Sequence, residues 1–243
     1  MTLTWSASTN GVAGAPAPDR SPPRESWTAA AKAVAVAVLL AVFGCGAANA
    51  DPVRLLAFGD SLTAGAGVAA EDSLSAQLQR RLLADGYDVV VVNAGVSGDT
   101  SAMGLARLDY TLGYGADVVL LELGANDMLN GVDPKITREN LDRIIATFKE
   151  RGVIVLLAGM VSSANFGPAY KKAFDAAYPE LARQHGVTMI PFILDGVWGH
   201  PELLIADGVH PNAAGVARIV AKVAPYVEKT IASLRAKRTG AGK

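Results

Sequence analysis

VRLLAFGDSL, residues 53–62, passes directly from an apolar run into small and polar residues. The run Val53–Phe58 is short and rich in aliphatic side chains, which is typical of a strand buried on both faces. Gly59, Asp60 and Ser61 follow at the point where that strand would end. Ligands of open parallel sheets bind beyond the carboxyl ends of the strands. This boundary therefore predicts both the first strand and the place of a functional site.

Four more runs repeat this apolar character and supply further expected strands. They are Val89–Asn93, Val118–Leu123, Val153–Met160 and Val187–Phe192. Between them lie stretches with apolar residues at helical spacing, namely Asp72–Gly86, Thr137–Gly152, Tyr170–Gly186 and Asn212–Leu234. Thr137 is the expected N-cap of the second of these helices. The regular alternation of strand and helix predicts an α/β fold, with helices on both faces of a five-stranded parallel sheet.

The composition fits one folded domain and gives no sign of a nucleic-acid partner. The chain has 243 residues, 51% of them hydrophobic, and a formal net charge of −1. This length suits one buried core, and we place that domain at residues 51–235. A nucleic-acid-binding protein would show a basic excess. The dense basic stretch Arg235–Arg238 is expected to be a solvated helix end, which leaves residues 236–243 as a basic tail.

Residues 1–50 are expected to be a signal peptide with an extended polar leader. Lys32 precedes an apolar run that ends at Phe43, and the small residues Ala48-Asn49-Ala50 follow it. A basic flank, a short apolar core and an A-x-A site predict cleavage after Ala50, with no membrane span left afterwards. The expected destination is the periplasm, with secretion as a second outcome.

Two other interpretations of this leader remain open. An uncleaved membrane anchor is one, but the apolar run is short for a span of about 20 residues. Acylation of Cys45, as in bacterial lipoproteins, is the other, but Phe43 is bulky for such a site. Cleavage after Ala50 is therefore favoured over both.

Cysteine and histidine are too few for a structural metal site. Cys45 is the single cysteine, and the three histidines are His185, His200 and His210. No two of these histidines have the spacing of ligands on one helix, and zinc sites need several ligands. We therefore expect no metal and no cofactor.

His210 is the best candidate for a catalytic base. Ester cleavage needs a nucleophile, a base and a group that orients the base. Asp207 lies three residues earlier in the same turn, where its carboxylate can reach the imidazole Nδ1–H. The alternative is that Asp207 only caps the turn and His210 is an ordinary surface residue. His185 is expected at a solvated helix end, and His200 precedes Pro201 in a loop.

Ser61 is the candidate nucleophile, because it follows the first strand at the edge where ligands collect. A serine at this place can instead cap the next helix. Gly98 can present a backbone N–H to a ligand, and Asn126 offers a side-chain amide. With the N–H of Ser61 they could hold a tetrahedral oxyanion. Taken singly, Gly98 also fits a simple turn and Asn126 a loop-capping amide.

Together these positions resemble the four sequence blocks of the GDSL, or SGNH, hydrolases. The matching segments are Gly59–Leu62, Asn93–Thr100, Gly124–Asp127 and Asp207–His210, in family order. The resemblance spans Val53 to Val227. It implies a flavodoxin-like three-layer α/β/α sandwich, a catalytic triad of Ser61, Asp207 and His210, and an oxyanion hole of Ser61, Gly98 and Asn126.

Two segments, Glu122–Asp127 and His210–Asn212, are similar to the branch of periplasmic acyl-thioesterases, lysophospholipases and arylesterases. The resemblance implies a serine esterase for aryl or short-to-medium acyl esters, with acyl thioesters and lysophospholipids as further substrates. Its partner would be a small-molecule ester or thioester. A carbohydrate acetylesterase is the alternative within the same chemistry.

Two non-catalytic interpretations compete with the esterase. Gly65–Ala70 fits the dinucleotide fingerprint G-x-G-x-x-A. However, these glycines begin past the expected strand end, and the second strand ends in Asn93 without the acidic residue that would bind ribose. A carbohydrate-binding module would leave the combination of Ser61, Asp207 and His210 unexplained.

The acyl pocket has several apolar candidates near the blocks. They are Met103, Leu105, Met160, Phe166, Tyr170 and Trp198. Each could line a groove, since such pockets are mainly hydrophobic, or could belong to the core. The loop Val161–Gly167 follows an expected strand and could move over the acyl chain. No cluster of Lys or Arg suggests a phosphate contact, so neutral esters are favoured.

Overall fold

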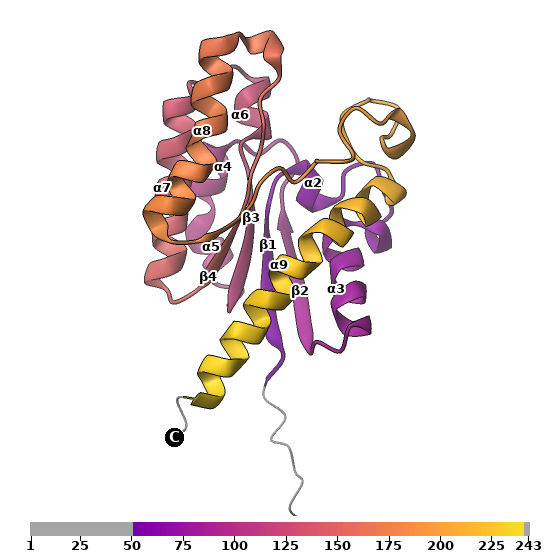
Figure 1. Cartoon of the computed structure of the whole chain (residues 1–243), viewed down its shortest axis with the longest axis vertical. Coiled ribbons are helices and arrows are strands. Elements are labelled where there is room, and N and C mark those ends of the chain that lie inside the picture. Colours follow the sequence, from indigo (N-terminus) through magenta and orange to yellow (C-terminus); the bar gives the residue numbers. More distant parts are fainter. Residues whose placement is uncertain (1–50, 241–243) are drawn as a thin grey trace, which may run out of the picture. The chain divides into compact units, whose positions relative to one another are not determined.

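Five parallel strands form the central sheet of the computed structural model, which describes residues 51–240 (Figure 1). They are β1 Val53–Gly59, β2 Val89–Gly95, β3 Val118–Glu122, β4 Ile154–Ala158 and β5 Thr188–Ile190. All five strands expected from the sequence are confirmed, with only their ends shifted. The strand order is β2-β1-β3-β4-β5, and every pair is parallel.

This order places a crevice between the ends of β1 and β3. The chain moves from β1 outward to β2, then returns past β1 to β3 and continues to β4 and β5 on the other side. Neighbouring loops at the carboxyl ends of β1 and β3 therefore lead away in opposite directions. Ligands of open α/β sheets bind at such a switch point.

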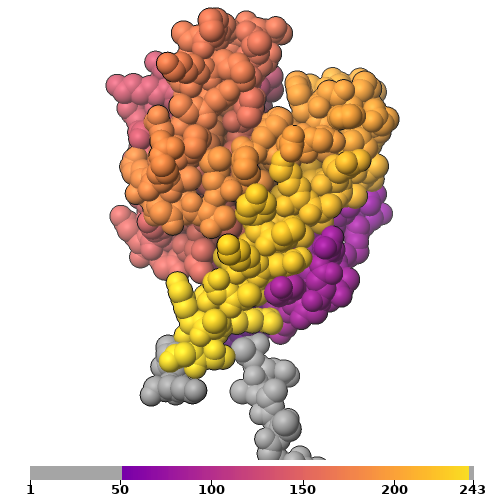
Figure 2. Space-filling model, viewed as in Figure 1, coloured from indigo at the N-terminus to yellow at the C-terminus, as the bar shows by residue number. Residues whose placement is uncertain are grey.

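Helices cover both faces of the sheet, so the three-layer α/β/α sandwich is confirmed. The helices are α2 Ser61–Ala64, α3 Leu74–Ala84, α4 Ser101–Ala106, α5 Leu108–Leu112, α6 Ala125–Leu129, α7 Pro134–Glu150, α8 Pro168–His185 and α9 Ala213–Gly240. Short 3₁₀ turns occupy Ala70–Asp72, Ala164–Phe166 and Pro201–Leu203. α3 and α9 pack together on one face (Figure 2), and α7 packs against α4 and α8 on the other (Figure 1).

The core lies on both sides of β1 and β3. All five residues of β3 are buried, as expected for a central strand covered by helices. α7 turns Leu141, Ile144, Ile145 and Phe148 toward the sheet. Phe148 meets Phe58 of β1 edge to face, with ring centroids 5.7 Å apart. Burial of this apolar surface stabilises the folded state by about 25 cal/mol per Å² removed from water.

The expectation that Thr137 caps α7 is wrong. The helix begins at Pro134, and the N-cap is Asp133, whose Oδ1 accepts a hydrogen bond from the N–H of Lys135 at 2.9 Å. Proline suits the first helical position because its missing N–H would have no partner there. Thr137 is buried inside the helix, and its hydroxyl donates to Asp127 at 3.1 Å.

The C-terminal helix is longer than expected. α9 continues past Leu234 to Gly240, so the first residues of the expected basic tail belong to it. Arg235 donates to the carbonyl of Asp88 at 3.0 Å, and Arg238 pairs with Asp117. These partners lie at the starts of β2 and β3, so the helix ends at the amino-terminal edge of the sheet (Figure 1).

The expected export signal, including Cys45 and the cleavage site after Ala50, lies outside the described residues. Within residues 51–240, no helix is both long enough and apolar enough to cross a membrane.

Candidate active site

The fold brings Ser61 and His210 into contact although they are far apart in the chain. Ser61 is the first residue of α2, directly beyond β1, and His210 lies in the loop between β5 and α9. His210 Nε2 lies 2.8 Å from Ser61 Oγ. The hydroxyl can donate this hydrogen bond to a neutral imidazole, as a nucleophile does to its general base.

Asp207 makes two kinds of hydrogen bond with its two carboxylate oxygens. Oδ2 lies 2.6 Å from His210 Nδ1, and Oδ1 accepts from the backbone N–H groups of Val209 at 2.8 Å and His210 at 2.9 Å. Asp207 therefore both caps its turn and orients the imidazole. The hydrogen bond with His210, followed by those from the backbone, lowers the pKa of Asp207 to about 2. Its carboxylate is ionised at neutral pH.

The other two histidines lie outside this arrangement. His200 is exposed and contacts Glu202 at 3.2 Å. His185 ends α8, as expected, but it is not solvated: its side chain is 13% exposed, and Nε2 lies 2.6 Å from Asp142 Oδ1 on α7. The helix pair α7–α8 shields it, so the expected solvated position is wrong.

Three sets of hydrogen-bond donors converge beside Ser61. Gly98 follows β2 with a φ of +87°, a conformation that side-chain-bearing residues rarely adopt. In the described part of the chain no acceptor takes a hydrogen bond from the backbone N–H of Ser61 or Gly98. Both residues line a cavity of about 290 Å³ together with Asn126 and His210.

The amide of Asn126 is already held by two acceptors. Its Nδ2 donates to Asp60 Oδ2 at 3.1 Å and to the backbone carbonyl of Asp99 at 3.0 Å. These bonds connect α6 to the end of β1 and to the loop after β2. A ligand oxygen that receives a hydrogen bond from Asn126 would share or replace one of these two bonds.

A buried carboxyl pair in the lining of the cavity was not found from the sequence. Asp60 is 2% exposed and Glu122, the last residue of β3, is fully buried. Burial raises the pKa of Asp60 to about 6 and, with the nearby Asp60 charge, raises the pKa of Glu122 well above its ordinary value. An acidic residue closing the otherwise apolar run Val118–Leu123 was the available signal.

Arg107 connects the loops around the cavity and was also missed. Its guanidinium contacts Asp99 Oδ2 at 2.6 Å, donates to the carbonyl of Gly59 at 3.0 Å and lies 4.3 Å from the centre of the Phe58 ring. Arg107 thus ties the end of β1 to the loop that carries Gly98. Nothing in the local sequence distinguishes this arginine from a solvated one.

The apolar wall of the cavity differs in part from the expected one. Met160 lines it, as one of the sequence candidates. Leu62, Leu129, Leu194 and Val209 also line it and were missed. Met103, Leu105, Phe166, Tyr170 and Trp198 do not line it.

Aromatic packing explains two of the candidates that do not line the cavity. The rings of Phe166 and Tyr170 lie 5.3 Å apart, and Tyr170 stacks on Phe174 at 6.0 Å. The hydroxyl of Tyr170 donates to the carbonyl of Val132 at 2.9 Å. These contacts direct both rings into the packing around α8.

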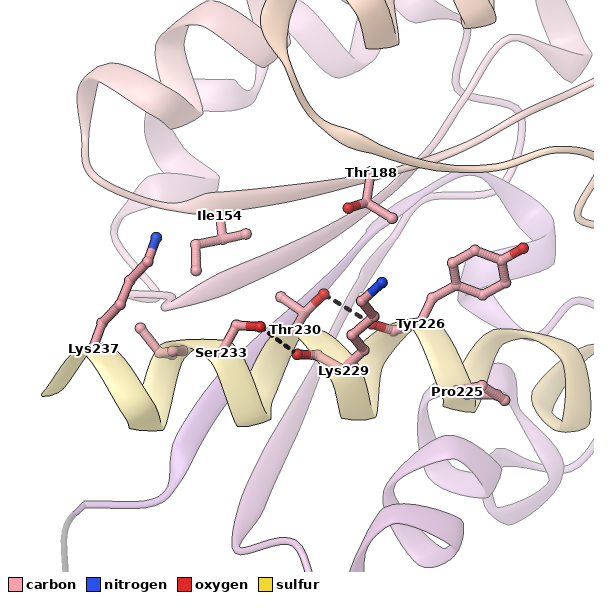
Figure 3. A pocket seen from close by; sticks show the side chains of 9 residues that line it. Ile154, Thr188, Pro225, Tyr226, Lys229, Thr230, Ser233 and Lys237 are labelled. Atoms are coloured by element: carbon pink, nitrogen blue, oxygen red, sulfur yellow. Dashed lines mark hydrogen bonds between the residues drawn. The ribbon is translucent and has the colours of Figure 1, made fainter. Parts of the chain in front are cut away.

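A larger groove lies elsewhere, between α9 and the edge of the sheet (Figure 3). Ile154 and Thr188, the first residues of β4 and β5, form one wall, and residues 225–237 of α9 form the other. The groove is therefore at the opposite end of the strands from Ser61. Two of its hydroxyls bond to their own helix, since Thr230 donates to the carbonyl of Tyr226 at 2.8 Å and Ser233 to that of Lys229 at 2.9 Å (Figure 3).

The dinucleotide interpretation does not fit the structure. Gly65 ends α2 in a left-handed conformation and Gly67 follows in the next turn, so these glycines do not open a helix after a strand. A pyrophosphate site needs that strand–turn–helix context.

A hydroxyl bonded to an imidazole, an imidazole bonded to a carboxylate, and N–H donors beside the hydroxyl form the arrangement of a serine hydrolase. The comparisons with known proteins agree with this class. The model of the GDSL-like Lipase/Acylhydrolase family matches residues 57–218. The chain belongs to this family and is a serine esterase of the GDSL type.

Named relatives are similar over most of the described domain. An arylesterase of Vibrio mimicus is 41% identical over 71% of this chain and 88% of its own. Thioesterase 1/protease 1/lysophospholipase L1 of Escherichia coli K12 is 40% identical over 68% of this chain and 78% of its own. The crystal structure of TesA superposes with a TM-score of 0.68, at 41% identity, over 71% of this chain and 96% of that one.

Proposed function

We propose that this esterase hydrolyses carboxylic esters through an acyl-enzyme intermediate on Ser61. The observation that carries the proposal is the continuous hydrogen-bonded series from Ser61 Oγ through His210 to Asp207, with distances of 2.8 and 2.6 Å. This series ends at the switch point of the sheet, where a substrate can reach the hydroxyl.

The first half of the reaction acylates the enzyme. Ser61 Oγ attacks the ester carbonyl carbon while His210 Nε2 takes the hydroxyl proton. The carbonyl π electrons move to oxygen and give a tetrahedral oxyanion. When this intermediate collapses, the bond to the leaving alcohol or thiol breaks, and the imidazolium returns its proton to that group. Asp207 stays ionised and stabilises the imidazolium.

The second half frees the acid. Water attacks the acyl-enzyme carbonyl while His210 accepts one of its protons, and the new tetrahedral intermediate collapses with return of that proton to Ser61 Oγ. The N–H groups of Ser61 and Gly98 and the amide of Asn126 stabilise both oxyanions in this proposal. Donors fixed in advance stabilise developing charge without a reorganisation cost.

The substrates we propose are neutral aryl and short-to-medium acyl esters, with acyl thioesters and lysophospholipids as further members. Support comes from the cavity beside Ser61, which is small and walled by Leu129, Met160 and Leu194, with no Lys or Arg in its lining. The names of the relatives, an arylesterase and a thioesterase/lysophospholipase, lie in the same range.

Kinetics of three variants test the mechanism. Ser61→Ala and His210→Ala should each remove most hydrolysis of p-nitrophenyl esters of increasing acyl length. The double variant should lose little more than either single one, because residues that act as one unit are not additive. Circular dichroism supplies the control for folding. If folded Ser61→Ala retained near-full activity, the mechanism would be wrong.

We also propose export to the periplasm with cleavage after Ala50. The support is the order of Lys32, the apolar run to Phe43 and the A-x-A site in the sequence. Intact mass of the protein purified from a periplasmic fraction should correspond to an N-terminal Asp51. A lipid adduct on Cys45, or an uncleaved chain, would contradict the proposal.

A further inference from the structure

Glu122 is a buried acid to which the hydrolytic steps give no role. It ends β3, is 0% exposed, and forms no ion pair with a lysine, arginine or histidine in the described part of the chain. Its Oε2 accepts from Thr63 Oγ1 at 2.8 Å and from the N–H of Asp60 at 3.3 Å. Its Oε1 is buried and receives no hydrogen bond from an N–H or hydroxyl group of the described residues. A buried carboxylate without a cation is costly. The burial of Glu122 and the missing partner of its Oε1 therefore need an explanation other than an ionised side chain.

The two acids are direct neighbours, because the backbone N–H of Asp60 donates to Glu122 Oε2 at 3.3 Å and both side chains are buried. Two adjacent buried carboxyl groups disfavour a second negative charge, so one of them carries a proton. Asp60 already accepts two N–H bonds, from Leu62 to Oδ1 and from Asn126 to Oδ2, each at 3.1 Å. Hydrogen bonds to the charged form favour it. Asp60 is therefore the ionised member, and Glu122 holds the proton.

The surroundings of the pair agree with this assignment. The charged or titratable groups near it are Asp99, His210 and Tyr178. Asp99 is neutralised by Arg107 at 2.6 Å, and Tyr178 donates its hydroxyl proton to the carbonyl of Leu123 at 2.9 Å. Burial and the adjacent Asp60 charge both raise the pKa of Glu122. Arg107 is paired with Asp99, and no lysine, arginine or histidine of the described residues forms an ion pair with Glu122.

The backbone makes room for this carboxyl group. A Cβ at Gly59 would lie 2.2 Å from Thr63 Oγ1 and 2.5 Å from Glu122 Oε2. The Glu122 side chain thus fills the space that the glycine leaves between β1 and the first turn of α2.

We propose that Glu122 is a positioning residue, whose neutral carboxylic acid donates a hydrogen bond to Asp60 and thereby fixes Asp60 as the acceptor for Asn126 and for the first turn of α2. Through Asp60, one proton on Glu122 orients both the Ser61 nucleophile and the Asn126 amide. This role rests on the proposed mechanism, in which Ser61 and Asn126 act on the ester.

Two substitutions separate this role from simple space filling. Glu122→Gln keeps a neutral side chain that can donate to Asp60 and accept from Thr63, whereas Glu122→Met keeps the volume without donor or acceptor. We expect Glu122→Gln to retain kcat within about threefold. Glu122→Met should lower kcat by about tenfold or more, the equivalent of one lost orienting hydrogen bond, with little change in KM. Its melting temperature should also fall, because the Thr63 hydroxyl and the Asp60 N–H lose their acceptor. Wild-type kcat in the folded Glu122→Met variant would overturn the proposal, as would an equal loss in both variants.

A spectroscopic measurement on the unsubstituted protein keeps the proposal testable if either variant fails to fold. Infrared spectra near pH 7.5 should contain the carbonyl stretch of a protonated carboxylic acid, because exposed carboxyl groups are ionised there. The band should be absent from Glu122→Gln. Its absence from the wild-type spectrum would refute a neutral Glu122. Ser61→Ala should show the same band, so failure of the proposed nucleophile and failure of this inference are distinguishable.

Discussion

At the scale of single residues, Asn126 has both amide hydrogens engaged, by Asp60 and by the carbonyl of Asp99. These bonds fix the amide beside Ser61 before any substrate arrives. A donor fixed in this way stabilises the transition state more than the bound ester. The same bonds make Asp60 a competitor for the amide, so in the proposed mechanism the strength of Asp60 as an acceptor controls how readily Asn126 can donate to an oxyanion.

Asn126→Ala should lower kcat by about 10²–10³, the usual effect of losing one oxyanion donor, and should change KM little. Steady-state kinetics with a p-nitrophenyl ester measure both constants, and the thermal melt of the variant shows whether it is folded. A kcat within about twofold of wild type would exclude Asn126 as a donor to the oxyanion.

The buried acids also predict how stability depends on pH. Burial raises the pKa of Asp60 from 3.8 to about 6 and that of Glu122 further above its ordinary value. The folded protein therefore binds more protons than the unfolded chain above the unfolded pKa values. The contribution of these two acids to stability should therefore fall as pH rises from about 4 through 6 and beyond. In that range the unfolded chain has released their protons, whereas the folded protein still retains them.

Glu122→Gln isolates this effect from the other ionisable groups. It removes one raised pKa, so the melting temperature of the variant should fall less steeply than that of wild type between pH 5 and 9. Thermal melts in a buffer series of constant ionic strength measure the two slopes. Parallel slopes would mean that Glu122 does not hold its proton in the folded state.

At the scale of elements, Asp127 joins three helices that surround the site. On α6, its carboxylate accepts from the N–H of Ser101 at 2.6 Å, from the Ser101 hydroxyl, and from Thr137 of α7 at 3.1 Å. Ser101 begins α4, and Asn140 of α7 donates to its hydroxyl at 3.0 Å. This network fixes α6, and with it Asn126, against α4 and α7.

Asp127→Ala should therefore lower stability rather than act on the chemistry. The substitution leaves three buried donors without an acceptor, at a cost of about 2–4 kcal/mol. Denaturant unfolding followed by circular dichroism measures this change. Asp109→Ala on α5 is the matched control: Asp109 is exposed and forms no ion pair in the described region, so its loss should change stability by less than about 0.5 kcal/mol. Equal effects of both substitutions would refute the structural role of Asp127.

The sequence predicted elements better than their boundaries. Apolar runs such as Val118–Leu123 identify strands because a central strand must be apolar on both faces. Short helices such as α2 and α6 could not be found in this way, since four or five residues carry no helical period. The cap of α7 was misplaced because Thr137 and Asp133 both suit an N-cap, and burial of Thr137 against Asp127 decides between them only in the folded chain.

At the scale of the whole molecule, the parallel direction of all five strands places the segments that follow β1 and β5 at the same edge of the sheet. Ser61 follows β1, and His210 lies 149 residues later in the chain. Spacing along the sequence could indicate Ser61, Gly98, Asn126, Asp207 and His210 as candidates, because each follows an expected strand or precedes the last helix.

The sequence could not show the groups beneath these candidates. Glu122, Asp60 and Arg107 acquire their partners only when β1, β3 and the loop after β2 lie side by side. Their individual residue types are common on protein surfaces, so no local pattern separates a buried acid from a solvated one. Burial and partner identity are properties of the assembled sheet.

The most direct test of the account is covalent labelling of the intact enzyme by a serine-directed p-nitrophenyl organophosphonate. We expect one phosphonyl group per chain, located on Ser61 by peptide mapping, with release of one equivalent of p-nitrophenol and complete loss of esterase activity. Ser61→Ala should not be labelled, and His210→Ala should be labelled far more slowly because the hydroxyl lacks its base. An adduct on Ser97 or Ser101, or full activity in a chain labelled on Ser61, would contradict it.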